Sequence, residues 1–301
     1  YAPRRSEAYE TEVTAEFFTL PRLQMRKRTK KATAAALTAA VLIAAGVLTS
    51  RYMLQTTEYT VCSERLPEGF DGFRIAQVSD LHGYEFGKGN ARLLAAIKSA
   101  EPDIIAITGD MADEDTDMEV IERFLAGAAE IAPVYYGSGN HEWGARCIAR
   151  LEELFEKYGV HYLSNEYEVV TRGEDSIVLA GAEDPNGPAG MMTPNELADI
   201  INEKENSPFA VLLGHRNYWI ERYPELEVDI ILSGHAHGGI VRLPLLGGAL
   251  GSGFRLFPDY TAGVYKSGRY SMIVSRGLGN SVFVPRFLNC PELVVLTLKK
   301  G

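Results

Sequence analysis

Residues 73–82 read FRIAQVSDLH, a mainly apolar run that ends in an aspartate and a histidine. Residues 73–79 have the length and composition of a buried β-strand. Residues i and i+2 of an extended chain point to the same side, so Asp80 and His82 can offer two ligands to one place. This stretch therefore predicts a strand with metal-binding side chains at its carboxyl end.

The same order, an apolar run and then polar residues, recurs at four later places. The four pairs are IIAIT (104–108) with Asp110, PVYYGSG (133–139) with Asn140 and His141, FAVLLG (209–214) with His215, and VDIILSG (228–234) with His235 and His237. In open α/β sheets, ligands bind beyond the carboxyl ends of the strands. We therefore expect all five polar motifs to meet at one site.

Helical stretches follow the first three of these strands and indicate the fold class. They are expected near residues 90–100, 117–130 and 145–158. This rhythm predicts an α/β domain whose parallel strands are covered by helices. Further strands are expected at residues 176–181, 271–275 and 292–298, and Gly and Pro at residues 237–263 predict a long loop or hairpin. One domain is expected.

Each motif taken singly has an ordinary structural explanation. A lone Gly-Asp, as at Asp110, usually marks a turn or a helix start, and a lone Gly-His, as at His215, usually marks a capped loop. Gly-His-x-His-Gly-Gly at residues 234–239 is more specific, because packing rarely needs two histidines on one face among glycines. Five of the six histidines lie in the motifs, and only His161 is interpreted as an ordinary surface residue.

The types of side chain in the motifs indicate the kind of metal. Carboxylate, amide and imidazole groups together suit Mn, Fe, Zn or Co better than Ca, which prefers oxygen ligands alone. Glycines beside the motifs let the backbone turn sharply and keep bulk away from the ions. The three cysteines, at positions 62, 147 and 290, have no metal-knuckle spacing and are too few for a disulfide framework.

An uncharged segment precedes the motifs. Residues 32–50 are 19 consecutive uncharged residues, about the length that crosses a hydrocarbon core of roughly 30 Å as a helix. Five of the six residues at 26–31 are basic. The positive-inside rule then predicts a single-pass signal-anchor in the cell membrane, with residues 51–301 on the extracytoplasmic side and residues 1–31 as a basic, disordered cytoplasmic tail. A cleaved signal peptide and a buried alanine-rich helix are the alternatives.

Charge is unevenly distributed along the chain, whose formal net charge is −10. Residues 1–31 carry eight basic and four acidic side chains, which leaves 22 basic and 36 acidic side chains for residues 51–301. A domain this acidic repels polyphosphate backbones. Nucleic acid is therefore not expected as the primary partner.

Taken in order, the five motifs resemble those of the calcineurin-like metallophosphoesterase superfamily, from about residue 73 to the end of the chain. The membrane-anchored bacterial branch is most similar, because of the basic and then apolar N-terminal segment, FDGFRIAQVSDLH at residues 70–82 and CPELVVLTL at residues 290–298. The resemblance implies an α/β fold of two stacked mixed β-sheets flanked by helices. One departure from the family pattern is GHRNYW at residues 214–219, which leaves the shape of the pocket open.

The resemblance also implies a role for each motif residue. The ligands that it implies for one divalent metal ion are Asp80, His82, Asp110 and His237. Asp110 would bridge to a second ion, which is completed by Asn140, His215 and His235. His141 would be the catalytic histidine beside the substrate oxygen.

These roles imply a phosphoesterase mechanism. Two such ions lower the pKa of a bridging water, so that a hydroxide can attack phosphorus near neutral pH, and a protonated His141 would donate to the leaving alkoxide. The expected activity is that of a phosphodiesterase on a small or membrane-proximal substrate, a lipid phosphoester included. A docking module without turnover and a hydrolase of amide or ester bonds are the alternatives. Arg276 and Arg286 are interpreted as members of surface salt bridges rather than as phosphate ligands.

Overall fold

The computed structural model describes residues 19–251 and 253–301, with side chains from residue 29 onward. The chain divides into two units, Tyr1–Gly46 and Val47–Gly301. All the strands described lie in the second unit, which we call the globular unit.

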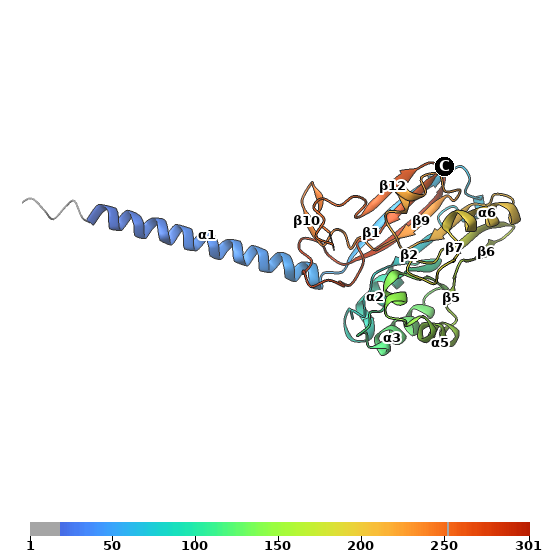
Figure 1. Cartoon of the computed structure of the whole chain (residues 1–301), viewed down its shortest axis with the longest axis horizontal. Coiled ribbons are helices and arrows are strands. Elements are labelled where there is room, and N and C mark those ends of the chain that lie inside the picture. Colours follow the sequence, from blue (N-terminus) through green and yellow to red (C-terminus); the bar gives the residue numbers. More distant parts are fainter. Residues whose placement is uncertain (1–18, 252) are drawn as a thin grey trace, which may run out of the picture. The chain divides into compact units, whose positions relative to one another are not determined.

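Helix α1 runs from Thr19 to Tyr52 (Figure 1). Its part from Thr29 to Tyr52, 24 residues with a mean hydropathy of 2.0 in its most apolar window, is long and apolar enough to cross a membrane. At 1.5 Å per residue, this part is about 36 Å long. By length and composition, α1 is a candidate membrane helix.

The start of α1 differs from the sequence-based expectation. The sequence predicts a disordered tail over residues 1–31, whereas α1 already includes residues 19–31. Lys and Arg are favourable helix formers, and an existing helix extends through such residues at low cost. The disorder predicted for residues 1–18 lies outside the described residues and stays a prediction.

The first of two six-stranded sheets has the strand order β1-β14-β2-β3-β4-β5. Its strands are β1 (Gln55–Ser63), β14 (Glu292–Lys300), β2 (Arg74–Val78), β3 (Ile104–Thr108), β4 (Val134–Gly137) and β5 (His161–Tyr162). β2, β3, β4 and β5 pair in parallel, and β14 pairs antiparallel with β2 and parallel with β1.

The second six-stranded sheet has the order β12-β13-β9-β8-β7-β6. Its strands are β12 (Gly263–Ser267), β13 (Tyr270–Val274), β9 (Ile230–Ser233), β8 (Ala210–Leu213), β7 (Asp175–Gly181) and β6 (Glu166–Arg172). The four inner strands are parallel, and β6 and β12 are antiparallel to their neighbours. A separate hairpin is formed by β10 (Val241–Leu243) and β11 (Gly247–Leu250).

Helices cover the outer faces of the two sheets. Those on the first sheet are α2 (Ala91–Ser99), α3 (Met118–Ala129) and α5 (Ile148–Tyr158), which lie together in Figure 1. Those on the second sheet are α6 (Pro194–Lys204) and α7 (Trp219–Arg222). Short helices between strands are η1 (Glu68–Phe70), η2 (Lys88–Asn90) and α4 (Asn140–Gly144).

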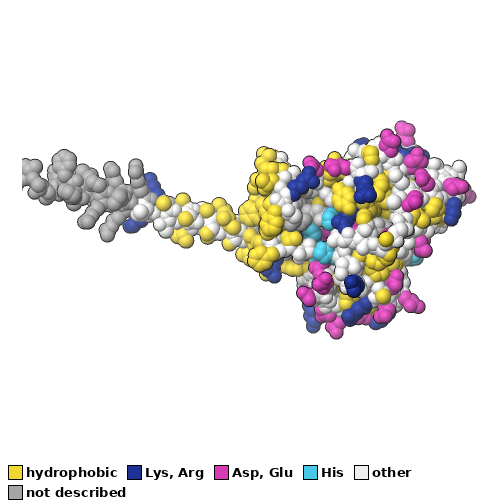
Figure 2. All heavy atoms as spheres, in the orientation of Figure 1, with side chains coloured by type: hydrophobic (Ala, Val, Ile, Leu, Met, Phe, Trp, Pro, Cys, Tyr) yellow, Lys and Arg dark blue, Asp and Glu magenta, His cyan; other side chains and the backbone are white. Residues whose placement is uncertain are grey.

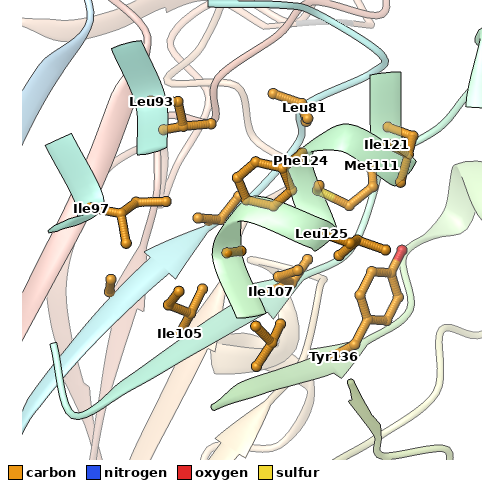
Figure 3. Close-up of a cluster of buried hydrophobic side chains, with 14 of the residues drawn as sticks. Leu81, Leu93, Ile97, Ile105, Ile107, Met111, Ile121, Phe124, Leu125 and Tyr136 are labelled. Carbon is orange, nitrogen blue, oxygen red and sulfur yellow. The ribbon is translucent and has the colours of Figure 1, made fainter. Parts of the chain in front are cut away.

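The alternation of side chains along each strand explains why two sheets and two helical layers form. In β3, Ile104 and Ala106 point into the core between the sheets, whereas Ile105 and Ile107 point into the core under the helices. Figure 3 shows Phe124 of α3 packed over this second core. Each such side chain stabilises the fold by about 1.5–3 kcal/mol when fully buried.

The predicted fold class, two stacked mixed sheets flanked by helices, is confirmed. Each strand and helix predicted by range is present, and residues 237–263 contain the hairpin β10–β11. The elements that were not predicted from the sequence are α4, α6 and α7, together with β1, β5, β6 and β12. All four missed strands lie at sheet edges with partly exposed residues, so their sequences lack a long apolar run.

Candidate metal centre

All eight residues singled out from the sequence lie at the carboxyl ends of strands. Asp80 and His82 follow β2, and Asp110 follows β3. Asn140 and His141 begin α4 after β4. The other three come from the second sheet, His215 after β8 and His235 and His237 after β9. Because the two sheets are stacked, the strand ends meet at one edge of the globular unit, and the expected convergence occurs.

One group of side chains at this edge is suited to hold a metal ion. It comprises Asp80, His82, Asp110 and His237, whose potential ligand atoms all lie within 4.8 Å of one another. Nε2 of His82 lies 3.3 Å from Nε2 of His237 and 3.8 Å from Oδ2 of Asp110. Nε2 of His237 lies 3.5 Å from Oδ1 of Asp80. Two imidazole nitrogens and two carboxylates thus face one point.

A second group shares one residue with the first. It comprises Asp110, His215 and His235, again with ligand atoms within 4.8 Å of one another. Nε2 of His215 lies 3.0 Å from Oδ2 of Asp110. Oδ1 of Asp110 accepts a hydrogen bond from the backbone amide of His141, so Oδ2 is the oxygen that faces both groups. A carboxylate placed in this way suits two neighbouring cations.

The hydrogen-bonding state of the second group tests whether a cation fits it. Oδ2 of Asp110, Oδ1 of Asn140 and Nε2 of His215 are buried and have no hydrogen-bond partner. Nδ1 of His215 lies 2.8 Å from the backbone oxygen of Thr108, which makes Nδ1 a donor to that oxygen and directs Nε2 toward Asp110. Buried polar atoms without partners are costly, and these three atoms, which come from two sheets, suit a cation between them.

Burial and neighbouring charges set the protonation of the histidines. Burial opposes the charged form of His215, yet the Asp110 carboxylate beside it raises its pKa to about 10, so a cation bound at Nε2 would displace a proton. Burial lowers the pKa of His235 to about 2 and that of His237 to about 3. Neutral imidazole is the form that binds metal, so the low pKa values of His235 and His237 suit them as ligands.

The backbone around the site is held in a conformation that few residues adopt. Asp80, His82, Asp110, His235 and His237 have φ between 48° and 65°, in the left-handed region. Non-glycine residues in this region cost roughly 1–3 kcal/mol each and cluster at functional sites. Two glycines make room for the carboxylates: a methyl group at Gly234 would lie 2.3 Å from Oδ2 of Asp80, and one at Gly139 would lie 2.2 Å from Oδ1 of Asp110.

Asp113 orients two of the histidines and was missed by the sequence analysis. Its Oδ1 lies 2.8 Å from Nδ1 of His82 and 2.6 Å from Nδ1 of His141. These contacts turn Nε2 of both rings toward Oδ2 of Asp110, at 3.8 Å and 3.9 Å. Hydrogen bonds from both histidines lower the pKa of Asp113, although burial opposes the shift. A carboxylate on the far nitrogen of a ligand histidine is the usual way to fix its tautomer.

Glu142 holds the loops that carry the site, and its role was also missed. Its buried carboxylate accepts hydrogen bonds from the backbone amides of Asp110, Met111 and Gly139 and from the hydroxyl of Tyr136. Glu142 belongs to the quoted Gly-Asn-His-Glu motif, so its presence there was a signal. Asp113 had no such signal, because acidic residues are frequent at positions 113–117.

The residues that depart from the expected family pattern lie beside the second group. Nη1 of Arg216 lies 3.0 Å from Nε2 of His235, and Nη2 of Arg216 lies 2.8 Å from Oδ1 of Asp184. His141 has 34% of its side chain exposed. An open hollow of about 310 Å³ is lined by Asp110, His141, His235, His237 and the loop residues Gly253, Ser281 and Val282.

Three further residues were interpreted from the sequence, and the structure shows where each of them lies. His161 lies on β5 and pairs with Glu168 away from the metal groups, as expected. Arg276 forms a salt bridge of 2.9 Å with Glu292 but is partly buried. For Arg286 the prediction of a surface salt bridge is wrong. Its buried guanidinium has no carboxylate partner among the described residues and lies 3.3 Å from Nδ1 of His237, because its loop folds back over that histidine.

Comparison with known proteins agrees with this geometry. Residues 73–239 match the model of the calcineurin-like phosphoesterase family. The metallophosphoesterase YkuE of Bacillus subtilis is 30% identical over 85% of this chain and 93% of its own length. The phosphodiesterase YaeI of Escherichia coli is 29% identical over 75% of this chain and 82% of its own length.

More distant similarities extend to animal proteins. A transmembrane protein with a metallophosphoesterase domain from Danio rerio is 26% identical over 87% of this chain and 61% of its own length. The solved structure of a dimetal phosphatase from Danio rerio covers 69% of this chain and 88% of its own, with 11% identity and a TM-score of 0.41. The family match and the relatives together identify the chain as a calcineurin-like phosphoesterase, a hydrolase of phosphoesters that works with two divalent metal ions.

Proposed function

We propose that the globular unit is a phosphodiesterase whose two ions are held by the two groups described above. One ion would be bound by Asp80, His82, Asp110 and His237, and the other by Asp110, Asn140, His215 and His235. The observation that carries this proposal is the set of three buried acceptor atoms without partners on Asp110, Asn140 and His215. Their donor types suit Mn, Fe or Zn.

Two divalent ions held in this way would lower the pKa of bound water and offset the charge that builds on the phosphoryl oxygens. The chain's own residues supply position and a proton. Asp113 holds Nδ1 of His141 and turns Nε2 toward the hollow at the metal centre. A proton on Nε2 would pass to the oxygen of the leaving group as the P–O bond breaks. Arg216, whose Nη1 lies 3.0 Å from Nε2 of His235, would offer a cation to a phosphoryl oxygen.

A preference for diesters is supported by the open shape of the hollow and by the similarity to a protein named a phosphodiesterase. A diester carries a second ester group, which needs space beside the phosphorus. Turnover of bis(p-nitrophenyl) phosphate should therefore exceed that of p-nitrophenyl phosphate with Mn-loaded full chain.

The same assay tests the rival activities. His141→Ala should lower diester turnover by about 10²–10⁴-fold, which is the usual contribution of general acid catalysis. His161→Ala, which removes the one histidine outside the site, is the matched control and should have no effect. Turnover of p-nitrophenyl acetate in preference to both phosphoesters would favour an ester hydrolase. Absence of turnover of all three would favour a docking module.

We also propose that α1 is a single-pass anchor and that the globular unit is extracytoplasmic. The basic residues before position 32 and the apolar part of α1 support this orientation. Cys62 is exposed and so reports the side on which the unit lies. With Cys147→Ser and Cys290→Ser in place, a membrane-impermeant maleimide should label Cys62 in intact cells. Labelling only after lysis would overturn the orientation.

A further inference from the structure

A pocket connects the metal centre with the last turn of α1. Its volume is about 300 Å³, which is within the range of small-molecule sites. His82 and Arg286 line it beside the metal centre, whereas Val47, Arg51 and Phe283 line it beside the helix. We call it the anchor pocket. The lining combines cationic side chains with apolar ones, so the pocket suits an amphipathic anion.

Arg286 gives the pocket a buried positive charge. The side chain is buried and donates to the backbone oxygen of Gly279, with no carboxylate partner among the described residues. A buried guanidinium without a counter-ion is costly, and it is well suited to receive a phosphate oxygen. Val47, Phe283, Pro285 and Pro291 give the pocket its apolar lining, and Arg51 adds a second cation.

Exposed apolar side chains lie on the loop that lines this pocket and on loops joined to it. Leu245, Leu246, Phe254, Leu256, Phe257 and Phe283 each expose 59% or more of their area, and we call them the apolar rim. They come from three loops that are tied together, because Val241 bridges to Phe287 and Leu250 bridges to Leu256. Figure 2 shows hydrophobic side chains gathered beside the histidines on this face of the globular unit. So much exposed apolar surface marks an interaction site.

The composition of the loops that carry the apolar rim indicates the kind of partner that would cover it. Residues 242–257 and 278–288 contain no Asp or Glu, although residues 51–301 have a large acidic excess. The same residues include Arg242, Arg255 and Arg286. Aromatic and leucine side chains with arginines and without acids are typical of segments that lie in the interface of a lipid bilayer.

The last turn of α1 indicates where a bilayer crossed by this helix would end. The backbone amide of Asn289 donates to Oγ of Ser50, so the end of α1 is held against the loop that follows the rim. A helix that spans a membrane from Thr29 to Tyr52 leaves the bilayer at residues 47–52, which are part of the globular unit. A bilayer crossed by α1 would therefore end beside the anchor pocket, which is lined by Val47, Arg51 and Phe283.

We propose that the substrate is a phosphoester of a membrane lipid, which enters the anchor pocket from the bilayer while the apolar rim rests in the lipid interface. The inference rests on the proposed phosphodiesterase function. The phosphate would lie between the metal centre and Arg286, and the first carbons of the lipid would lie along Phe283 and Val47. In the reaction, the oxygen of water bonds to phosphorus, the bond to the leaving oxygen breaks, and that oxygen takes a proton.

The first test measures insertion of the rim without any turnover. The full chain is reconstituted into vesicles of phosphatidylcholine with brominated acyl chains, which quench tryptophan emission at short range. The Phe283→Trp variant should gain emission that the brominated lipid quenches, relative to the parent chain with its two tryptophans. Val169→Trp replaces an exposed apolar residue of β6 and should not be quenched. Equal emission from Phe283→Trp in brominated and ordinary lipid would overturn the proposal.

The second test compares two substrates. The Mn-loaded full chain is given phosphatidylglycerol or phosphatidic acid in vesicles, or soluble bis(p-nitrophenyl) phosphate. The ratio of lipid to soluble turnover should fall about tenfold or more in Leu245→Ser/Leu246→Ser, because this variant lacks two apolar side chains that would lie in the lipid interface. The ratio should stay constant in Val169→Ser.

The outcomes separate this inference from the proposed function. Turnover of the soluble diester without turnover of either lipid would overturn the inference and leave the phosphodiesterase proposal intact. Turnover of neither substrate class would overturn both. Cross-linking that places the apolar rim between two copies of the chain, with an unchanged ratio in the rim variants, would assign the rim to a dimer and overturn the role of the bilayer.

Discussion

The backbone amide of Asp110 donates a hydrogen bond to the buried carboxylate of Glu142 across 3.0 Å. The same carboxylate accepts from Met111 and Gly139, so one side chain joins the loops after β3 and β4. These loops carry Asp110, Asn140 and His141. The geometry of the metal centre therefore depends on a residue that does not face the ions.

Replacement of Glu142 by Gln should lower the free energy of unfolding. The Gln side chain has one acceptor oxygen, and its amide nitrogen would face backbone amides that need an acceptor. With each unsatisfied buried donor costing about 1–3 kcal/mol, we expect a loss of about 2–4 kcal/mol in the free energy of unfolding. Urea denaturation of the Glu142→Gln variant measures this loss, with the exposed Glu156→Gln on α5 as the control. Equal denaturation midpoints for the two variants would contradict the role given to Glu142.

Asp113 should affect metal affinity without being a ligand. Asp113→Asn weakens the hold on Nδ1 of both His82 and His141, and changes of this kind typically lower metal affinity or activity about 10–100-fold. The measurement is a Mn titration followed by diester kinetics. The nearby exposed residue Asp115 provides the matched variant Asp115→Asn, which should leave both quantities unchanged. If Asp113→Asn left the Mn affinity and the rate of diester turnover unchanged, the orienting role given to Asp113 would be contradicted.

Arg216 should contribute to phosphodiester turnover. Its guanidinium is held by Asp184 and lies beside His235, where a phosphoryl oxygen would come within reach. Loss of a charge-assisted hydrogen bond of about 1.5–3 kcal/mol corresponds to a fall in kcat/KM of about 10–100-fold in Arg216→Ala. Arg222→Ala on α7 is the control. A fall in metal content instead of kcat/KM would show that Arg216 supports His235 rather than the substrate.

The thiol of Cys147 should report on the packing around Glu142. Burial, and then the charge of Glu142, raises the pKa of Cys147 to about 11. The thiol form is favoured in the folded state, so this contribution to stability is present below the ordinary pKa of about 8.5 and is lost as pH rises through 11. At pH 8 iodoacetamide should modify Cys147 about a hundredfold more slowly than a free thiol, and faster as pH approaches 11. Rapid modification at pH 8 would contradict the buried environment.

The predictable part of the structure follows from local patterns. The apolar runs that became β2, β3, β4, β8 and β9 are short and continuous, as expected for strands buried on both faces. Their carboxyl ends had to meet, so the eight site residues could be assembled without knowing the sheet order. Edge strands such as β6 lack this signal, because one of their faces is partly exposed.

The unpredicted features depend on contacts between distant segments. The joint contact of Asp113 with His82 and His141 needs the exact placement of two loops, and no spacing rule encodes it. The left-handed backbone at His235 and Asp110 is likewise imposed by the surrounding fold rather than by residue type. Arg286 was misassigned because its burial results from a loop that returns over His237.

The central claim is that Asp110 binds two cations at once. Anomalous X-ray diffraction at the Mn absorption edge, from crystals of the Mn-loaded full chain, locates the ions directly. We expect two peaks about 3.5–4 Å apart, both within bonding distance of Asp110, with Asn140 and His215 bonded to one of them. A single peak, or peaks away from Asp110, would contradict the account.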